Sequence, residues 1–154
     1  RLTIENDDKA SMYSVVDLYE GIYKVVGIPI VFDYYHHKFC TGGLTEEQAL
    51  KLAASTWPKG VKQCTHYSES RRKEKMLKVE NFLNDSNITL EQIHDFPTME
   101  KMYKECQKIK EQAHSDYIKS DINDYGLDID VVVEAKAKEL ALKKYKKVLT
   151  EVSD

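Results

Sequence analysis

Four side chains of the kind that bind divalent metals lie where short apolar runs of the sequence end. They are Glu5 after residues 2–4, Asp33 after residues 28–32, His66 at the end of residues 61–66, and Glu134 after residues 130–133. One polar residue at such a place is commonly a cap or a turn former, but four in succession are hard to explain in that way. Mixed carboxylate and imidazole ligands suit Zn²⁺, Mn²⁺ or Fe²⁺. Two such cations about 3.5–4 Å apart activate water and stabilise the charged oxygens in phosphodiester cleavage, so metal-assisted hydrolysis is the first hypothesis.

The cysteines make a thiol-based or disulfide-based role the weaker hypothesis. Cys40, Cys64 and Cys106 are odd in number, widely spaced and without a CxxC pair, which argues against a disulfide framework and a structural zinc site. Only Cys64, two residues before His66, has a base close to it in the sequence, so a thiol nucleophile is not favoured. Reduced cysteines favour an intracellular compartment. The sequence does not distinguish nucleus, cytoplasm and virus particle.

The composition predicts a folded protein without a membrane role. The chain of 154 residues is 42% hydrophobic and 32% charged, which supplies enough apolar material for a core. Its formal net charge of −3 carries no signature of nucleic-acid binding, although a local basic groove or a bound metal still attracts phosphate. No apolar run approaches the roughly 20 residues that span a bilayer.

The order of the predicted elements indicates α/β architecture. Runs rich in Val, Ile and Phe at residues 2–4, 28–32 and 130–133, with a weaker run at 61–66, are typical of parallel strands covered on both faces. One helix is expected to open at a capping box at Thr45, with Leu50, Ala53 and Ala54 facing inward, and another to run from about residue 135 to 152. A further helix, ended by Gly27, is expected to bury one apolar face, formed by Met12, Val15, Val16, Tyr19, Ile22, Tyr23 and Val26.

Four strands with their helices make half of a (β/α)₈ TIM barrel, which needs about 250 residues. In such a barrel the C-terminal ends of the strands point into the active site, so the four metal-type side chains would gather there. Half a barrel leaves two open sheet edges. We therefore expect a partner half, covalent or separate, and the start on Arg1 rather than Met agrees with upstream sequence.

Residues 68–112 interrupt this alternation and are interpreted as a charged helical insertion between the third and fourth strands. A helix within them is expected to start at Thr98 after Pro97, with one apolar face formed by Met99, Met102, Tyr103, Cys106 and Ile109. The insertion also carries four basic residues, Arg71, Arg72, Lys73 and Lys75. A solvated helix face is the favoured interpretation of these residues, and contact with nucleic-acid phosphates is the alternative.

Five segments, in order, resemble the UV-damage endonuclease family. They are LTIENDD at residues 2–8, GIPIVFDYYHH at 27–37, TW at 56–57 with HYSES at 66–70, AHSDYI at 113–118, and EAKAKE at 134–139. The resemblance extends over nearly the whole chain and is absent only from the insertion. It implies that residues 1–154 are the C-terminal half of a TIM-barrel DNA-repair endonuclease. Such an enzyme would nick damaged double-stranded DNA 5′ to UV lesions or abasic sites.

The same resemblance implies roles for individual residues around two or three divalent ions, with Mn²⁺ favoured over Zn²⁺. Glu5 would bridge two ions, and Asp33 and His66 would bind one of them with Glu134 beside it. His36 would bind another ion, helped by His114 and Asp116. Glu5, His66 and Glu134 would then be the catalytic set. The remaining histidine ligands of the family belong to the N-terminal half, so this chain would hold part of the site.

One departure from the family pattern keeps two alternatives open. Members usually have Lys, carboxylated in some of them, two residues before the histidine of HYSES. Cys64 has that position here. Lys62 is two residues before Cys64, and the two-residue period of a strand places it on the same face. This puts carbamate-assisted metal binding in doubt. The alternatives are a catalytically inactive remnant or structural subunit of the same fold, and a sugar isomerase of the xylose type, which also places Glu, Asp and His at barrel strand ends.

Overall fold

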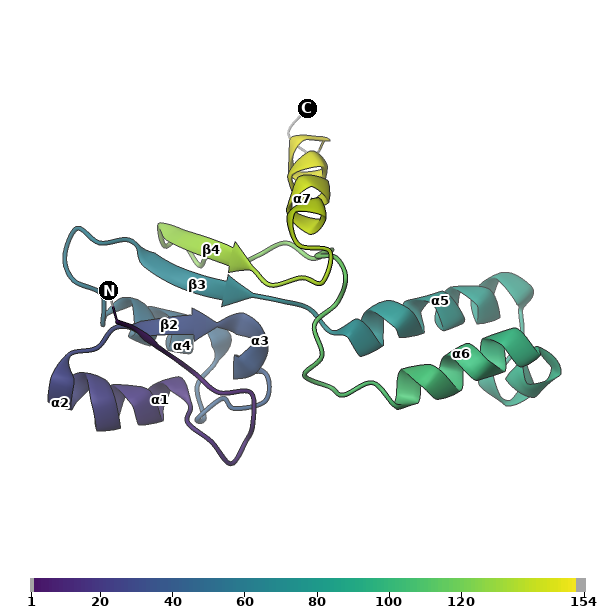
Figure 1. Ribbon diagram of the computed structural model, residues 1–154, viewed down its shortest axis with the longest axis horizontal. Helices are drawn as coiled ribbons and strands as arrows, with labels where there is room; N and C mark the ends of the chain where they lie inside the picture. The colour runs from purple at the N-terminus through teal and green to yellow at the C-terminus, as the bar shows by residue number, and fades with distance from the viewer. Residues whose placement is uncertain (1, 152–154) are drawn as a thin grey trace. The chain divides into compact units, whose positions relative to one another are not determined.

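The computed structural model describes residues 2–151, and these divide into two compact units. The first unit contains the residues up to Ser68 together with Lys119–Glu134, and the second contains Glu69–Ile118 together with the residues from Ala135 onward. Each unit is therefore built from two separate stretches of the chain, which differ in colour in Figure 1. Among the described residues, no helix combines the length and the apolar composition of a transmembrane span.

A parallel sheet of four strands, in the order β1-β2-β3-β4, forms the centre of the first unit (Figure 1). The strands are β1 (Ile4–Glu5), β2 (Ile30–Asp33), β3 (Gln63–Tyr67) and β4 (Ile129–Val133). All four predicted strands are present, including the weakly predicted third. The α/β prediction with a parallel sheet is therefore confirmed.

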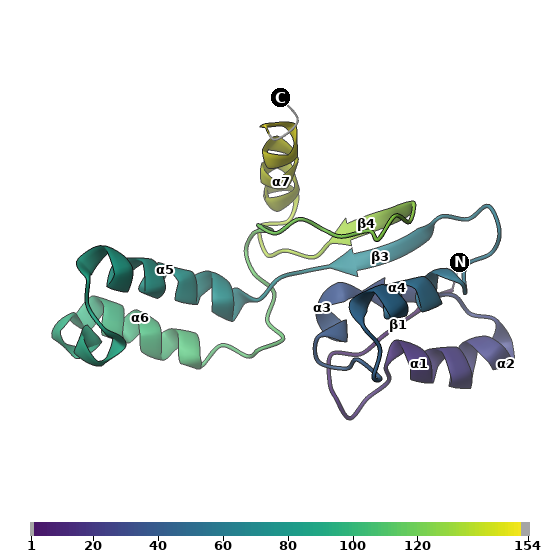
Figure 2. The ribbon, with the colours of Figure 1, turned by 180° about the vertical axis from the view of Figure 1, so that it is seen from behind.

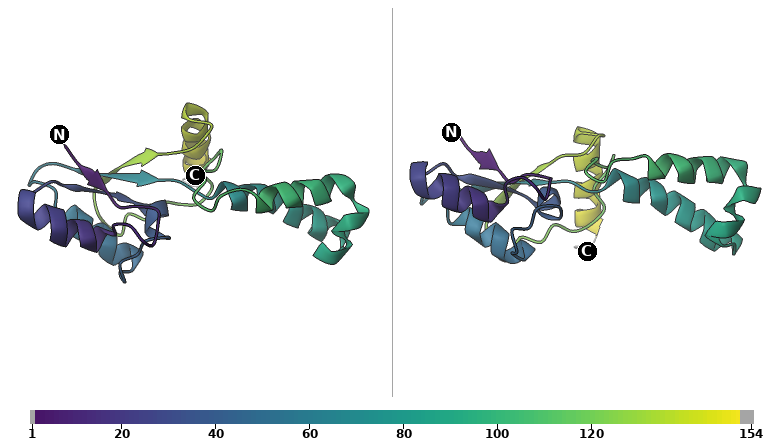
Figure 3. Two further views of the ribbon diagram at one scale, coloured as in Figure 1. Left: turned by 60° about the horizontal axis from the view of Figure 1, so that its bottom comes forward. Right: turned by 90° about the horizontal axis from the view of Figure 1, so that it is seen from below.

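Helices of the first unit gather on one side of this sheet (Figures 2 and 3). They are α1 (Val15–Leu18), the π-helical turn η1 (Tyr19–Tyr23), α2 (Lys24–Val26), α3 (Tyr34–His37) and α4 (Glu46–Ala54). Ile30 and Phe32 of β2 are fully buried, as are Leu50 and Ala53 of α4, which packs on β2. The predicted capping box at Thr45 is present at the start of α4. This packing leaves the other face of the sheet for the polar side chains.

The helix predicted over residues 12–26 has the right place but a different buried face. It begins after Ser14, which forms a capping box of its own, and it ends at Gly27, whose φ of 71° makes it the predicted left-handed C-cap. Val15 of the predicted face is buried, and so is Leu18, which the prediction left out. Three residues predicted for the apolar face are exposed: Met12, Ile22 and Val26. Met12 precedes the helix, whereas Ile22 and Val26 lie within or after the π-helical turn, which adds a residue and rotates the side chains that follow.

The second unit consists of helices and their connections. Its helical segments are α5 (Arg71–Ser86), η2 (Leu90–Asp95), α6 (Pro97–Gln107) and α7 (Glu139–Glu151). Helices α5 and α6 lie side by side (Figures 1 and 2). Val79, Ile93 and Cys106 are buried, and the rings of Phe82 and Phe96 meet edge to face with centroids 5.2 Å apart. Helix α6 starts one residue before the predicted Thr98, because proline suits the first helical position.

The last helix begins later than predicted, at Glu139 rather than at residue 135. The N–H groups of Lys136 and Ala137 donate to carbonyl groups of segment 113–118, and Lys138 has a φ of 50°. These residues therefore form a turn that is bound to another segment instead of the first turn of a helix. The predicted end of the helix at residue 152 lies outside the described residues.

Candidate metal centre

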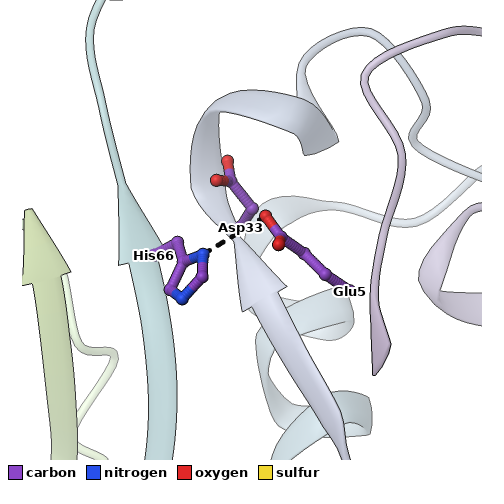
Figure 4. A group of neighbouring side chains, drawn as sticks. All are labelled: Glu5, Asp33 and His66. Carbon is purple, nitrogen blue, oxygen red and sulfur yellow. Dashed lines mark ion pairs between the residues drawn. The ribbon is translucent and has the colours of Figure 1, made fainter. Parts of the chain in front are cut away.

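Glu5, Asp33 and His66 come from three neighbouring parallel strands and meet on one face of the sheet (Figure 4). The register pairs Asp33 with His66, and it pairs Glu5 with Val31, two residues before Asp33 on the same strand. Because side chains alternate with a period of two, this register directs all three to the same face. One ligand-type atom from each residue lies within 4.8 Å of the others. The structure therefore brings these three predicted site residues together.

His66 lies between two carboxylates. Its Nδ1 atom is 3.3 Å from Glu5 Oε1 and 3.3 Å from Glu134 Oε1. Glu134 is brought there by the end of β4, where its N–H donates to the carbonyl of Tyr67 at 2.8 Å and extends the strand pairing. Glu134 thus joins the group as the fourth of the strand-end residues identified from the sequence.

Asp33 uses one carboxylate oxygen for the fold and leaves the other without a donor. Oδ1 caps α3 by accepting the N–H groups of Tyr35 and His36 at 2.7 and 2.8 Å. Oδ2 is buried and accepts no hydrogen bond from the described part of the chain, and it lies 3.9 Å from Nε2 of His36. His36 Nδ1 is 3.4 Å from Glu5 Oε1, so the same Glu5 oxygen lies near both imidazoles.

The ionisation of the group reflects this crowding of like and unlike charges. Burial of Asp33, together with the negative charge of Glu5, raises the pKa of the Asp33 carboxyl to about 6. The Glu5 carboxylate raises the pKa of His66 above its ordinary value. Burial also acts to raise the pKa of Glu5, but the imidazoles of His66 and His36 outweigh it and hold the pKa of Glu5 below its usual value. A positive charge beside these carboxyl groups therefore stabilises their ionised form.

The residues present fit a divalent cation. A buried carboxylate oxygen without a hydrogen-bond donor is costly, because it has lost its hydration and gained no partner. A cation bound between Asp33 Oδ2 and the imidazoles would supply the missing interaction. Two or more carboxylates with imidazoles form the donor set that suits Mn²⁺ and Zn²⁺.

The other two predicted ligands, His114 and Asp116, belong to the second unit. Lys75 Nζ donates to the carboxylate of Asp116 at 2.9 Å, and Arg71 Nη1 lies 3.5 Å from it. Lys75 in particular lowers the pKa of Asp116 below its ordinary value. His114 pairs with Ser70 in an isolated antiparallel bridge. Within its unit, the segment is therefore held by ion pairs and main-chain bonds, and metal binding by these two residues stays a prediction.

The departure at Cys64 also has a structural counterpart. Cys64 has a half-buried thiol whose pKa is raised by burial and by the charges of Asp130 and Glu5. Lys62, one pair back on β3, forms ion pairs with Asp128 at 2.7 Å and with Asp130 at 3.6 Å. The only nearby candidate for the family lysine is therefore engaged with carboxylates among the residues described.

Sequence reasoning missed Asn6, which contacts two of the predicted ligands. Its side chain is bonded to the main chain of Asp33, and its carbonyl oxygen is 2.8 Å from His36 Nδ1. A carboxamide is not among the side chains that usually bind these metals, so the only indication in the sequence was the position of Asn6 directly after Glu5. His37, the histidine next to His36 in the same motif, is buried against Phe32.

Comparison with known proteins gives a consistent result. The family described as UV-endonuclease UvdE matches residues 1–154. The UV-damage endonuclease of Neurospora crassa is 37% identical over 79 residues, which cover 45% of this chain and 12% of that protein. The UV-damage endonuclease of Schizosaccharomyces pombe is 38% identical over 76 residues, which cover 46% of this chain and 12% of that protein.

A solved structure described as the crystal structure of SacUVDE is also similar. It matches with a TM-score of 0.62 and 25% sequence identity, over 99% of this chain and 40% of that chain. The match therefore extends over almost all of this chain. The chain spans less than half of the solved protein, and its matched regions are a small part of the two fungal proteins.

Proposed function

Because the chain belongs to the UV-endonuclease UvdE family, we propose that the protein containing it is an endonuclease that repairs damaged double-stranded DNA. On this proposal it cleaves the phosphodiester 5′ to UV lesions or abasic sites by metal-assisted hydrolysis. The observation that supports the chemistry best is the buried Asp33 Oδ2, which faces an imidazole and has no donor among the described residues. Such an oxygen at the end of a parallel strand is a natural ligand for a divalent cation.

We assign the metal ligands within the first unit to Glu5, Asp33, His36, His66 and Glu134, with Mn²⁺ as the preferred ion and Zn²⁺ as the alternative. Glu5 is the candidate bridge that the resemblance implies, and one of its carboxylate oxygens lies within 4.8 Å of ligand atoms of Asp33 and His66. Divalent ions at such a centre lower the pKa of bound water and neutralise charge on the phosphodiester oxygens. Glu134, beside His66, is suited to hold a proton that leaves this water.

His114 and Asp116 are included in the proposal on the strength of the AHSDYI motif alone. If Asp116 binds metal, its carboxylate exchanges the ion pairs with Lys75 and Arg71 for the cation. The gain from the metal is then partly offset by the loss of those pairs. We expect its contribution to be smaller than that of Asp33, one of whose oxygens has no hydrogen-bond donor among the residues that the structure describes.

We also propose that residues 1–154 form the C-terminal half of a (β/α)₈ barrel, completed by an N-terminal half. The strand order supports this, since each strand of β1-β2-β3-β4 adds on the same side, without the reversal typical of doubly wound sheets. Residues 68–112 are the proposed insertion between the third and fourth strands, and they include α5, η2 and α6. The exposed Val132 on the edge strand β4 is the kind of surface that a partner half would cover.

The proposal is tested with Mn²⁺ binding and with strand cleavage in the intact protein. We expect calorimetric titration to detect Mn²⁺ binding and irradiated supercoiled plasmid to be nicked, with both lost in Asp33→Asn. Glu47→Gln is the matched control, because Glu47 is an exposed carboxylate paired with Lys51 on α4. Binding of Mn²⁺ without nicking would favour the inactive remnant, and turnover of an aldose would favour the isomerase.

A further inference from the structure

Asn6 is a buried polar residue whose carboxamide makes a hydrogen bond at each end. It lies directly after β1 and is 1% exposed. Its Nδ2 donates to the carbonyl of Asp33 at 3.0 Å, and its Oδ1 accepts the N–H of Asp33 at 2.8 Å. The carboxamide here uses one acceptor and one donor, as a peptide group would. It therefore extends the pairing of β1 with β2 by one step after the main chain of β1 has ended.

Because the side chain makes these bonds, the main-chain carbonyl of Asn6 is free to make another contact. Its oxygen lies 2.8 Å from Nδ1 of His36. A carbonyl oxygen can only accept, so Nδ1 must carry a proton, and in the neutral ring Nε2 then keeps its lone pair. Nε2 is the atom that faces the buried oxygen of Asp33, at 3.9 Å. Two such atoms at this separation can bind one cation with bonds of about 2.0–2.2 Å.

We propose that Asn6 is a positioning residue for the metal centre. Its side chain holds the main chain of Asp33, and its carbonyl selects the His36 tautomer in which Nε2 is the ligand. The metal-binding role of Asp33 and His36 rests on the proposed function, but the tautomer does not. Neither Asp nor Ala replaces both bonds: Asp lacks the donor for the Asp33 carbonyl, and Ala leaves two main-chain groups without a partner.

The first test needs neither metal nor DNA. In the intact, metal-free protein at about pH 8, where histidine is ordinarily neutral, the ring ¹⁵N shifts of His36 report which nitrogen is protonated. We expect the Nδ1–H form. An Nε2–H form, or an equal mixture, overturns the proposal even if the protein binds Mn²⁺ and cleaves DNA. The Nδ1–H form in a protein that binds no Mn²⁺ refutes the metal assignment instead, and with it the positioning role.

The second test separates positioning from ordinary stabilisation of β2. Thr56 supplies the matched control, because its hydroxyl accepts the N–H of Ile30 at 2.9 Å at the other end of the same strand. We expect Asn6→Ala and Thr56→Val both to lower stability. Ala keeps the main-chain carbonyl that faces His36 but loses the side-chain bonds that hold this segment against Asp33. Only Asn6→Ala should therefore loosen the carbonyl contact, mix the His36 tautomers and weaken Mn²⁺ binding, by about 10- to 100-fold. Equal effects of the two variants on Mn²⁺ affinity, or none from Asn6→Ala, overturn the proposal. If Asn6→Ala does not fold, the His36 tautomer measured in the unsubstituted protein decides whether the proposal stands.

Discussion

Asp33 in the first unit and Asp116 in the second are both carboxylates that sequence motifs connect with metal, yet their surroundings are opposite. Asp33 is buried beside imidazoles and another carboxylate, with one oxygen that lacks a donor among the described residues. Asp116 is bonded to Lys75 and lies near Arg71. The pKa of Asp33 is raised to about 6 mainly by burial, whereas Lys75 lowers the pKa of Asp116. A sequence motif thus identifies a candidate carboxylate. The residues around that carboxylate in the fold decide whether it already has a cationic partner or can still gain one.

The largest expected difference between the two residues is in metal affinity. Asp33→Asn keeps the oxygen that caps α3 but removes the negative charge. The variant should weaken Mn²⁺ binding by at least about 100-fold, which is more than the loss of a residue that only hydrogen-bonds to a ligand. Asp116→Asn should weaken binding by less than about 10-fold, because its carboxylate already has cationic partners. Calorimetric titration of both variants checks this. Equal losses would show that Asp116 gives up its ion pairs to the metal.

The pH dependence of binding sharpens the same comparison. Metal needs an ionised Asp33 and a neutral His66, and the pKa of each is raised in the metal-free protein. Protons therefore compete increasingly as the pH falls through about 6. We expect Mn²⁺ affinity to fall by about 10- to 100-fold between roughly pH 7 and pH 5. An affinity that is level over this interval would contradict the assignment of these two ligands.

In the metal-free protein, neutralising Asp33 should stabilise the fold. Its folded pKa lies above the ordinary value of 3.8, so its charge destabilises the folded state once the pH exceeds that value. Asp33→Asn should therefore raise the free energy of unfolding at neutral pH by about 3 kcal/mol, and by almost nothing below about pH 4. Urea denaturation in the presence of a chelator measures this. Excess Mn²⁺ should reverse the order of stability of the two proteins.

The smallest effect, and the opposite sign, is expected for Asp116. Its lowered folded pKa means that its charge stabilises the fold above the unfolded value and that this contribution is lost as the pH falls through the folded pKa. Asp116→Asn should lower the free energy of unfolding at neutral pH by about 0.5 kcal/mol, since the carboxylate is partly exposed. The same denaturation experiment applies. A stabilising Asp116→Asn would remove the contrast with Asp33.

Periodicity and residue type were sufficient to predict the α/β class, the four strands and the strand-end positions of Glu5, Asp33, His66 and Glu134. These properties are local: apolar runs of the right length become buried strands, and the residue after a strand lies at its end. The capping box at Thr45 and the C-cap at Gly27 were predicted for the same reason, since a cap involves only neighbours in sequence.

Tertiary structure decided which atoms of these residues have partners. The π-helical turn moved the buried face of the helix at residues 12–26, and bonds to segment 113–118 delayed the start of α7. The ion pair of Asp116 with Lys75 and the bonds of the Asn6 side chain to Asp33 join residues at least 27 positions apart. Burial leaves Oδ2 of Asp33 without a donor among the described residues. Pattern and spacing report only near neighbours along the chain. Burial and long-range pairing, which control charge and hydrogen bonding, become visible only when distant segments are placed side by side.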